Sequence, residues 1–187
     1  PQDDLLIEEL TVYQNLFYNA SLCLGDNNKT EIDKVVIKLL NNLDLFYIKD
    51  LKVGTPLNKF ISGGQRKRLN IALELIREPS ILLADEPTTG LSSTDSGNVM
   101  QLLNELSLRG KIVIINIHKP SSEIFKMFDK LIILDKGGYP VYLGNPLDSF
   151  SYLKKIAYRI DAADYECPYC GNVQPDEILE IIEAKQV

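Results

Sequence analysis

Apolar residues recur at helical spacing through residues 1–78. Thr11 and Gln14 form a capping-box pattern, in which each side chain bonds an unpaired amide of the first turn, and they predict the start of one helix. Thr30 and Asp33 predict the start of a second helix. One face of this second helix carries Ile32, Val35, Val36, Leu39, Leu40 and Leu43. We therefore expect a helical region over this part of the chain.

A third helix is predicted just before Pro79, and it begins with two glycines. Ser62 and Gln65 form its capping box. Gly63 and Gly64 occupy its first turn, although each glycine inside a helix costs roughly 1 kcal/mol relative to alanine. Because helix N-termini attract anions, the bare backbone predicts a phosphate at the amides of Ser62, Gly63 and Gly64. The alternative, a cap without a ligand, leaves the glycine cost unexplained.

After residue 79 the pattern changes to short apolar runs separated by helix-like segments. The runs read SILLAD, KIVIINI and KLIILD. Such runs are typical of buried parallel strands, so we expect an α/β core over residues 79–160. Residues 139–144 predict an antiparallel edge strand, and Pro146 begins a last helix. Residues 161–187 are interpreted as a C-terminal extension.

Composition adds limits on the partners of the chain. Its 187 residues carry 26 acidic and 20 basic side chains, a formal net charge of −6. This balance argues against a nucleic-acid partner, because a surface that binds nucleic acid needs clustered Lys and Arg. The one basic run, Arg66–Arg68, equally fits a solvated helix face. No apolar run approaches the roughly 18 residues of a membrane span. Three cysteines do not make a secreted disulfide framework, so we expect a soluble chain in a reducing compartment.

Two adjacent carboxylates follow the first apolar run. Asp85 and Glu86 would stand at the carboxyl end of a strand, where open α/β sheets place their ligands. An Asp at this place holds Mg²⁺ in P-loop NTPases, and a second carboxylate can orient the attacking water. An ordinary turn before Pro87 is the alternative, and it fits the pair equally well when the pair is taken alone.

The only histidine, His118, ends the next apolar run. A lone histidine is more often structural than functional. Its position at the same carboxyl edge as Asp85 and Glu86 nevertheless favours contact with the same phosphate.

Five motifs together resemble the ATP-binding-cassette (ABC) ATPases, in the order that this family has. ISGGQRKR resembles the signature motif, ILLADEP the Walker B strand, GLSSTDS the D-loop and NIHKP the switch-histidine loop. Gln2 in PQDD resembles the Q-loop. The stretches LTVYQNL, IHKPSSEIFKMFDKLIIL and YECPYCGNVQPDEILEII are similar to the white/pleiotropic-drug-resistance group, the G subfamily of ABC transporters.

This resemblance implies a P-loop NTPase (ABC ATPase) core with an α-helical signature subdomain, and ATP and Mg²⁺ as cofactors. Asp85 would hold Mg²⁺, Glu86 would orient the water and His118 would contact the γ-phosphate. Gln2 would also lie at the metal and link it to a membrane domain.

The resemblance also implies two partners. A second ATPase domain would pair head to tail, so that the signature residues close over the ATP held by the P-loop of the other domain. Those nucleotide-binding residues are Ser62, Gly63, Gly64 and Gln65. A transmembrane domain would follow on the same full-length polypeptide. The chain would then act on the cytoplasmic side of the plasma (inner) membrane and couple ATP binding and hydrolysis to transport.

Three departures from the family pattern affect these expectations. No G-x-x-x-x-G-K-[ST] motif occurs, so the core is expected to be incomplete at its N-terminus and the isolated chain inactive as an ATP hydrolase. Ser92 stands at the usual D-loop aspartate, which puts the cross-dimer contact of that residue in doubt. Lys119 replaces the glutamine that usually follows the switch histidine.

Two other interpretations remain open. A soluble ABC ATPase of DNA repair or translation shares the motifs, but the subfamily stretches and the acidic balance disfavour it. The CPYCG stretch, with Cys167 and Cys170, fits a thiol or zinc-binding module. Few residues follow Cys170 for a glutaredoxin-like fold, and a zinc site needs two further ligands, so structural thiols are favoured.

Overall fold

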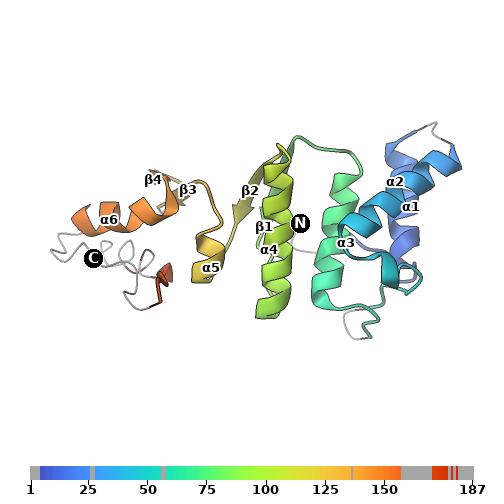
Figure 1. Ribbon diagram of the computed structural model, residues 1–187, viewed down its shortest axis with the longest axis horizontal. Helices are drawn as coiled ribbons and strands as arrows, with labels where there is room; N and C mark the ends of the chain where they lie inside the picture. The colour runs from blue at the N-terminus through green and yellow to red at the C-terminus, as the bar shows by residue number, and fades with distance from the viewer. Residues whose placement is uncertain are drawn as a thin grey trace. The chain divides into compact units, whose positions relative to one another are not determined.

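The computed structural model describes residues 5–25, 28–55, 58–135, 137–156, 170–176, 178 and 180. The chain divides into two compact units, Pro1–Ile117 and His118–Val187. The first unit contains helices α1 to α4, a short 3-10 helix and strands β1 and β2, and the second contains α5, α6, β3 and β4 (Figure 1). The boundary between the units falls within the segment 79–160.

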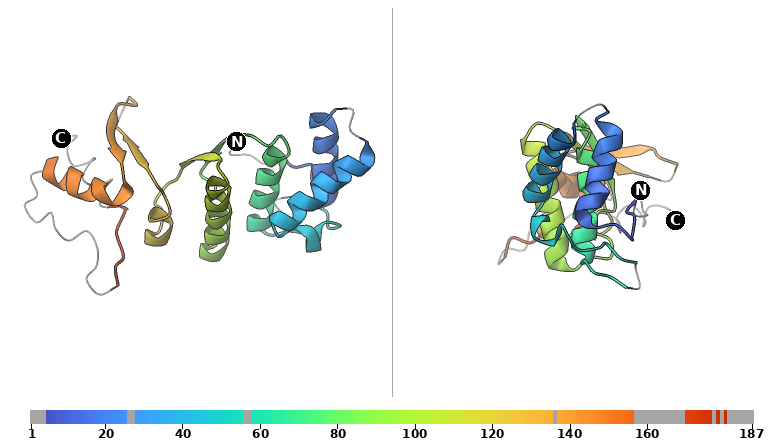
Figure 2. Two further views of the ribbon diagram at one scale, coloured as in Figure 1. Left: turned by 45° about the horizontal axis from the view of Figure 1, so that its top comes forward. Right: turned by 90° about the vertical axis from the view of Figure 1, so that its right-hand side faces the viewer.

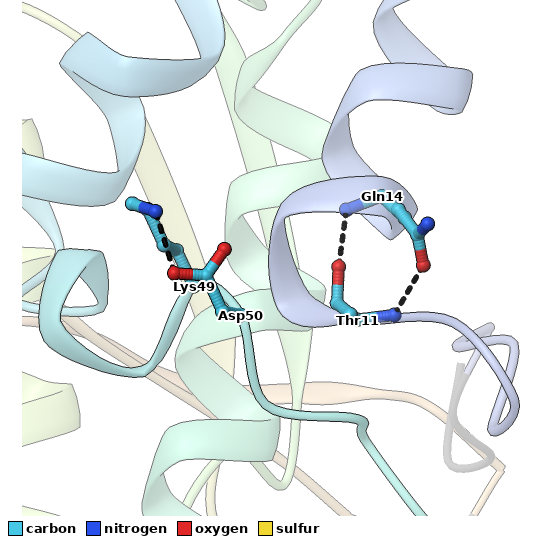
Figure 3. Close-up of polar contacts among 4 residues, drawn as sticks. All are labelled: Thr11, Gln14, Lys49 and Asp50. Carbon is cyan, nitrogen blue, oxygen red and sulfur yellow. Dashed lines mark hydrogen bonds and ion pairs between the residues drawn. The ribbon is translucent and has the colours of Figure 1, made fainter.

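Helix α1, Val12–Cys23, begins with the capping box that the sequence predicts (Figure 3). The amide of Gln14 donates to Thr11 Oγ1 at 3.1 Å, and the amide of Thr11 donates to Gln14 Oε1 at 2.9 Å. Nearby, Lys49 Nζ lies 2.6 Å from Asp50 Oδ2. Loss of an N-cap typically costs about 0.5–2 kcal/mol, whereas an exposed ion pair contributes about 0–1 kcal/mol. The capping box is therefore the more stabilising of the two features.

Helix α2, Lys29–Asn42, begins earlier than the sequence pattern suggests. The expected start at Thr30 and Asp33 is wrong, because Asn28 is the N-cap. Its side-chain oxygen accepts from the amide of Glu31 at 2.9 Å. Asparagine is among the strongest N-cap residues, so it sets the helix start ahead of threonine.

Helix α3, Gly63–Leu75, packs against α1, α2 and α4 and completes a buried apolar core. The core includes Val12, Leu16, Val36, Leu40, Leu45, Leu69, Ala72, Val99 and Leu103. Arg66 and Arg68 are buried on α3, so the interpretation of the basic run as a solvated face is wrong. Arg66 Nη1 donates to the carbonyl oxygen of Gly54 at 2.6 Å, which gives the buried guanidinium a partner in the loop before α3.

Strands β1, Ile81–Asp85, and β2, Ile112–Asn116, are parallel, as the apolar runs predict. Helix α4, Ser93–Leu108, connects them and packs against β2. Burial alternates along both strands, so the expectation of strands buried on both sides is wrong. Leu82 is buried, whereas Leu83 is 72% exposed. The exposed apolar sheet face consists of Ile81, Leu83, Ile112 and Ile114.

We expect this exposed sheet face to drive self-association, because parallel sheets are stable where both faces are covered. Burying a Leu or Ile side chain contributes about 1.5–3 kcal/mol, so replacing Leu83 and Ile114 with threonine together should weaken association at least about tenfold. Light scattering across a concentration series measures this effect. Leu108→Thr, an equally apolar exposed position on α4, is the matched control. A monomer at every concentration, or an equal effect of the control, contradicts the expectation.

The second unit is built on a hairpin that packs against the last helix (Figure 2). Its elements are α5, Ser122–Phe125; β3, Leu131–Leu134; β4, Pro140–Gly144; and α6, Pro146–Ile156. The expectation of a parallel third strand is wrong, because β3 pairs antiparallel with β4. Gly137 and Gly138 adopt positive φ between the two strands, and such short glycine-containing loops favour hairpins. The small core of this unit comprises Phe125, Ile133, Phe150, Leu153, Val173 and Ile178.

Candidate nucleotide-binding site

Asp85 ends β1 and faces a hydrogen-bond partner on the neighbouring strand. The parallel register sets Asp85 opposite Asn116, the last residue of β2. Asn116 Nδ2 donates to Asp85 Oδ1 at 2.8 Å, and the side chain of Asp85 is exposed. One oxygen of this exposed carboxylate is therefore held by the neighbouring strand. A fixed carboxylate of this kind fits Mg²⁺, which usually binds one or two protein carboxylates and keeps its waters.

Glu86 follows in a turn that fixes its backbone and its side chain. Its φ of 44° lies in the left-handed region, which is uncommon for residues other than glycine. The Glu86 amide donates to the carbonyl oxygen of Asn116 at 2.8 Å, and Thr89 Oγ1 donates to Glu86 Oε2 at 2.9 Å. Backbone strain of this kind typically costs about 1–3 kcal/mol. Asp44, Glu78 and Lys119 also have positive φ, so the feature that distinguishes Glu86 is its pair of hydrogen bonds to Asn116 and Thr89.

The start of α3 has the predicted capping box. The amide of Gln65 donates to Ser62 Oγ at 3.2 Å, and the amide of Ser62 donates to Gln65 Oε1 at 2.7 Å. Gln65 Nε2 also donates to the Tyr47 hydroxyl at 2.9 Å. Both polar ends of the Gln65 side chain are thus engaged within the protein, which makes Gln65 a residue that shapes the helix start.

The two glycines of α3 have different surroundings. A Cβ added to Gly63 would meet only Leu91 Cδ2, at 3.2 Å. A Cβ added to Gly64 would lie 2.3 Å from Asp95 Oδ1 and 3.0 Å from Asp95 Cβ. A side chain at position 64 would therefore force the Asp95 side chain of α4 to move even without a ligand, which the sequence pattern did not indicate.

Ser92 caps α4 in the structure. Its hydroxyl accepts from the amide of Asp95 and lies 3.1 Å from Asp95 Oδ2, to which it donates. Ser92, which stands at the position of the D-loop aspartate, is thus a strong N-cap residue for α4.

The remaining predicted residues are His118, Lys119, Gln2 and two cysteines. His118 is exposed and is the first residue of the second unit, and Lys119 after it has a φ of 48°. Gln2 and Cys167 lie outside the described residues, and Cys170 is exposed. Among the residues with described positions, no group of three or more His, Cys, Asp or Glu side chains is placed to hold a metal ion. Within the same residues, no helix has the length and apolar character needed to cross a membrane.

Asn116 and Thr89 were missed by sequence reasoning. A signal for Asn116 was present, because it ends the apolar run that pairs with β1. Thr89 lies three residues after Glu86, the spacing at which a turn brings side chains together.

Family models match both parts of the chain. A model described as "ABC transporter" matches residues 1–89, and one described as "ABC-2 type transporter" matches residues 118–182. Among solved structures, cbiO1 from Clostridium perfringens, part of the ABC transporter complex cbiONQ, superposes with a TM-score of 0.65 at 29% identity. That superposition covers 81% of this chain and 59% of cbiO1, which establishes a mixed α/β ABC ATPase-like fold.

Curated relatives match nearly the whole chain. The chain is 36% identical over 185 residues to ABC transporter G family member 25 of Oryza sativa subsp. japonica, covering 98% of this chain and 18% of the relative. It is 39% identical over 182 residues to the broad substrate specificity ATP-binding cassette transporter ABCG2 of Bos taurus, covering 97% of this chain and 26% of the relative. The chain thus spans about a quarter or less of the length of these two relatives. The chain belongs to the G subfamily of ABC transporters and forms part of an ATPase domain of that subfamily.

Proposed function

We propose that this chain, within a full-length protein, forms part of an ATPase domain whose ATP binding and hydrolysis drive transport across a membrane. The observation that carries the proposal is the paired carboxylate arrangement at the end of β1. Asn116 holds Asp85, and Thr89 holds Glu86 in a strained turn. In this proposal α1 to α3 form the signature subdomain, and β1, β2 and α4 form one portion of an incomplete P-loop NTPase core.

The two carboxylates have separate roles in the proposed reaction. Asp85 would hold Mg²⁺ through the oxygen that Asn116 leaves open. Mg²⁺ held there would neutralise charge on the phosphates of ATP. Glu86 would orient the attacking water and accept its proton, and the hydroxyl of Thr89 keeps the carboxylate in that orientation.

The start of α3 would serve a second ATPase domain. Ser62, Gly63 and Gly64 would close over the γ-phosphate held by that partner, since anions are favoured at the first turn of a helix. The Ser62 amide already donates to Gln65 Oε1, so the amides that would contact the phosphate are those of Gly63 and Gly64. Gln65 would support this turn through its capping bonds. His118 would contact the γ-phosphate on this chain's own side.

The proposed membrane partner follows from the family. The second unit, matched by the "ABC-2 type transporter" model, would lead to a transmembrane domain on the same polypeptide. Gln2 would lie at the metal and link it to that domain. The ATPase domain would then face the cytoplasm at the plasma (inner) membrane. A soluble ABC ATPase of DNA repair or translation is less well supported, because the relatives described above are named as transporters.

The isolated 187-residue chain is expected to show no ATP turnover and no micromolar binding of Mg-ATP. The reason is chemical: a P-loop supplies the lysine and nested amides that bind the β- and γ-phosphates, and its motif does not occur in this sequence. Calorimetry with Mg-ATP measures the binding. A dissociation constant in the micromolar range would contradict the expectation. The function itself is tested by ATP turnover of the full-length protein in lipid vesicles, and absence of turnover would reject it.

A further inference from the structure

Helices α3 and α4 approach each other most closely where Asp95 meets Gly64. Gly64 is buried, and the space that a Cβ would take there is filled by the Asp95 side chain, whose Oδ1, Cγ and Cβ would lie 2.3, 2.6 and 3.0 Å from it. Rotation of the Asp95 side chain could move Oδ1 and Cγ. It cannot move the Asp95 Cβ, which is fixed to the backbone of α4. The contact is therefore one between two helices and not only between two flexible groups.

The Asp95 carboxylate is held from a second direction. Ser92 Oγ donates to Asp95 Oδ2 at 3.1 Å, and the same hydroxyl accepts the amide of Asp95 at 3.1 Å. Because Ser92 is the N-cap of α4, the orientation of the carboxylate depends on how that helix begins. Gly97, a residue of α4 itself, has no atom within 4 Å of its missing Cβ, so of these two glycines only Gly64 makes a tight contact.

A continuous set of contacts joins this point to the carboxylates of β1. The Thr89 hydroxyl donates to Glu86, and the amide of Leu91 donates to the carbonyl oxygen of Thr88 at 3.2 Å. Ser92 is the next residue in the chain after Leu91. We propose that Asp95 is a positioning residue: by filling the space that Gly64 leaves, it sets the first turn of α3 relative to the turn that carries Glu86. This inference rests on the proposed function, since it assigns that first turn to a phosphate.

The contact between Gly64 and Asp95 would lie between the two composite ATP sites. In the proposed pair, the first turn of α3 serves the partner's ATP, whereas Asp85 and Glu86 serve the ATP of their own chain. The contact between Gly64 and Asp95 would then join the two sites within one chain.

A double-mutant cycle tests the proposed contact on the 187-residue chain. Gly64→Ala is expected to lower the midpoint of thermal unfolding, and adding Asp95→Ala is expected to recover part of the loss, since only the Cβ at 3.0 Å remains. Asp95→Asn keeps the shape of the side chain and should give no recovery. Gly97→Ala is the matched control and should not lower the midpoint. An equal loss from Gly64→Ala with and without Asp95 would overturn the contact.

The role in the reaction is tested on the full-length protein by the ATP dependence of turnover. Gly64→Ala should raise KM and lower kcat. Adding Asp95→Ala to the Gly64→Ala protein should raise kcat/KM by between about 2-fold and 100-fold, which corresponds to the interaction energies of residues in contact. Asp95→Ala alone should reduce the Hill coefficient for ATP, an effect that loss of stability does not produce. No recovery of kcat/KM, or an unchanged Hill coefficient, rejects the positioning role. Loss of ATP turnover in the unsubstituted protein would instead reject the proposed function.

Discussion

Glu86→Gln is expected to reduce ATP turnover of the full-length protein by at least about 100- to 10,000-fold, the usual contribution of a general base. The amide keeps the size of the side chain and can still bond to Thr89, but it lacks the charge that polarises water. Binding of Mg-ATP and closure of the paired domains should persist. Turnover and ATP-dependent dimerisation, measured on the same preparation, separate these effects.

Glu78→Gln is a matched control for this substitution. Glu78 is also a glutamate with positive φ, 48°, but it is exposed after α3 and is not a residue of the proposed site. The control should turn over ATP at the normal rate. Near-normal turnover in Glu86→Gln, or loss of closure in that variant alone, would show that Glu86 does not orient the water.

Asp85→Asn should instead weaken Mg-ATP itself. Removing a group that merely supports a metal ligand typically costs about 10- to 100-fold in affinity, so loss of the charged ligand should cost at least as much. Asn116→Ala should fall within that range, because it frees Asp85 Oδ1 without removing the carboxylate. The measurement is the Mg-ATP concentration that gives half-maximal closure.

Asp44→Asn serves as the control for Asp85→Asn. Asp44 is exposed with a φ of 53°, a conformation that asparagine tolerates well, and it lies outside β1. Its half-maximal concentration should not change. Unchanged Mg-ATP affinity in Asp85→Asn would contradict its assignment to the metal.

The features predicted correctly from the sequence are those set by short-range patterns. The capping boxes at Thr11 and Ser62 depend on residues three positions apart, so the local sequence determines them. The start of α2 was misplaced because two nearby cap patterns competed, and asparagine at 28 is the stronger cap.

The features that were missed depend on long-range contacts. Asn116 is recognised as a partner of Asp85 only once the register of β1 and β2 is known. The burial of Arg68 and the tight contact between Gly64 and Asp95 follow from packing between segments that are distant in sequence. The antiparallel pairing of β3 was missed because an apolar run has no direction, and the loop that follows it decides the pairing.

A mixing experiment tests the head-to-tail composite site. One full-length variant would carry Ser62→Arg, which blocks the start of α3, and the other would carry Asp85→Asn. Each variant alone should turn over ATP far more slowly than the unsubstituted protein, at Mg-ATP concentrations that just saturate the unsubstituted protein. In a mixed pair, the intact α3 of the second variant would face the intact Asp85 of the first and restore one site. The account predicts turnover in the mixture well above either variant alone, whereas turnover no higher than the mean of the two would contradict it.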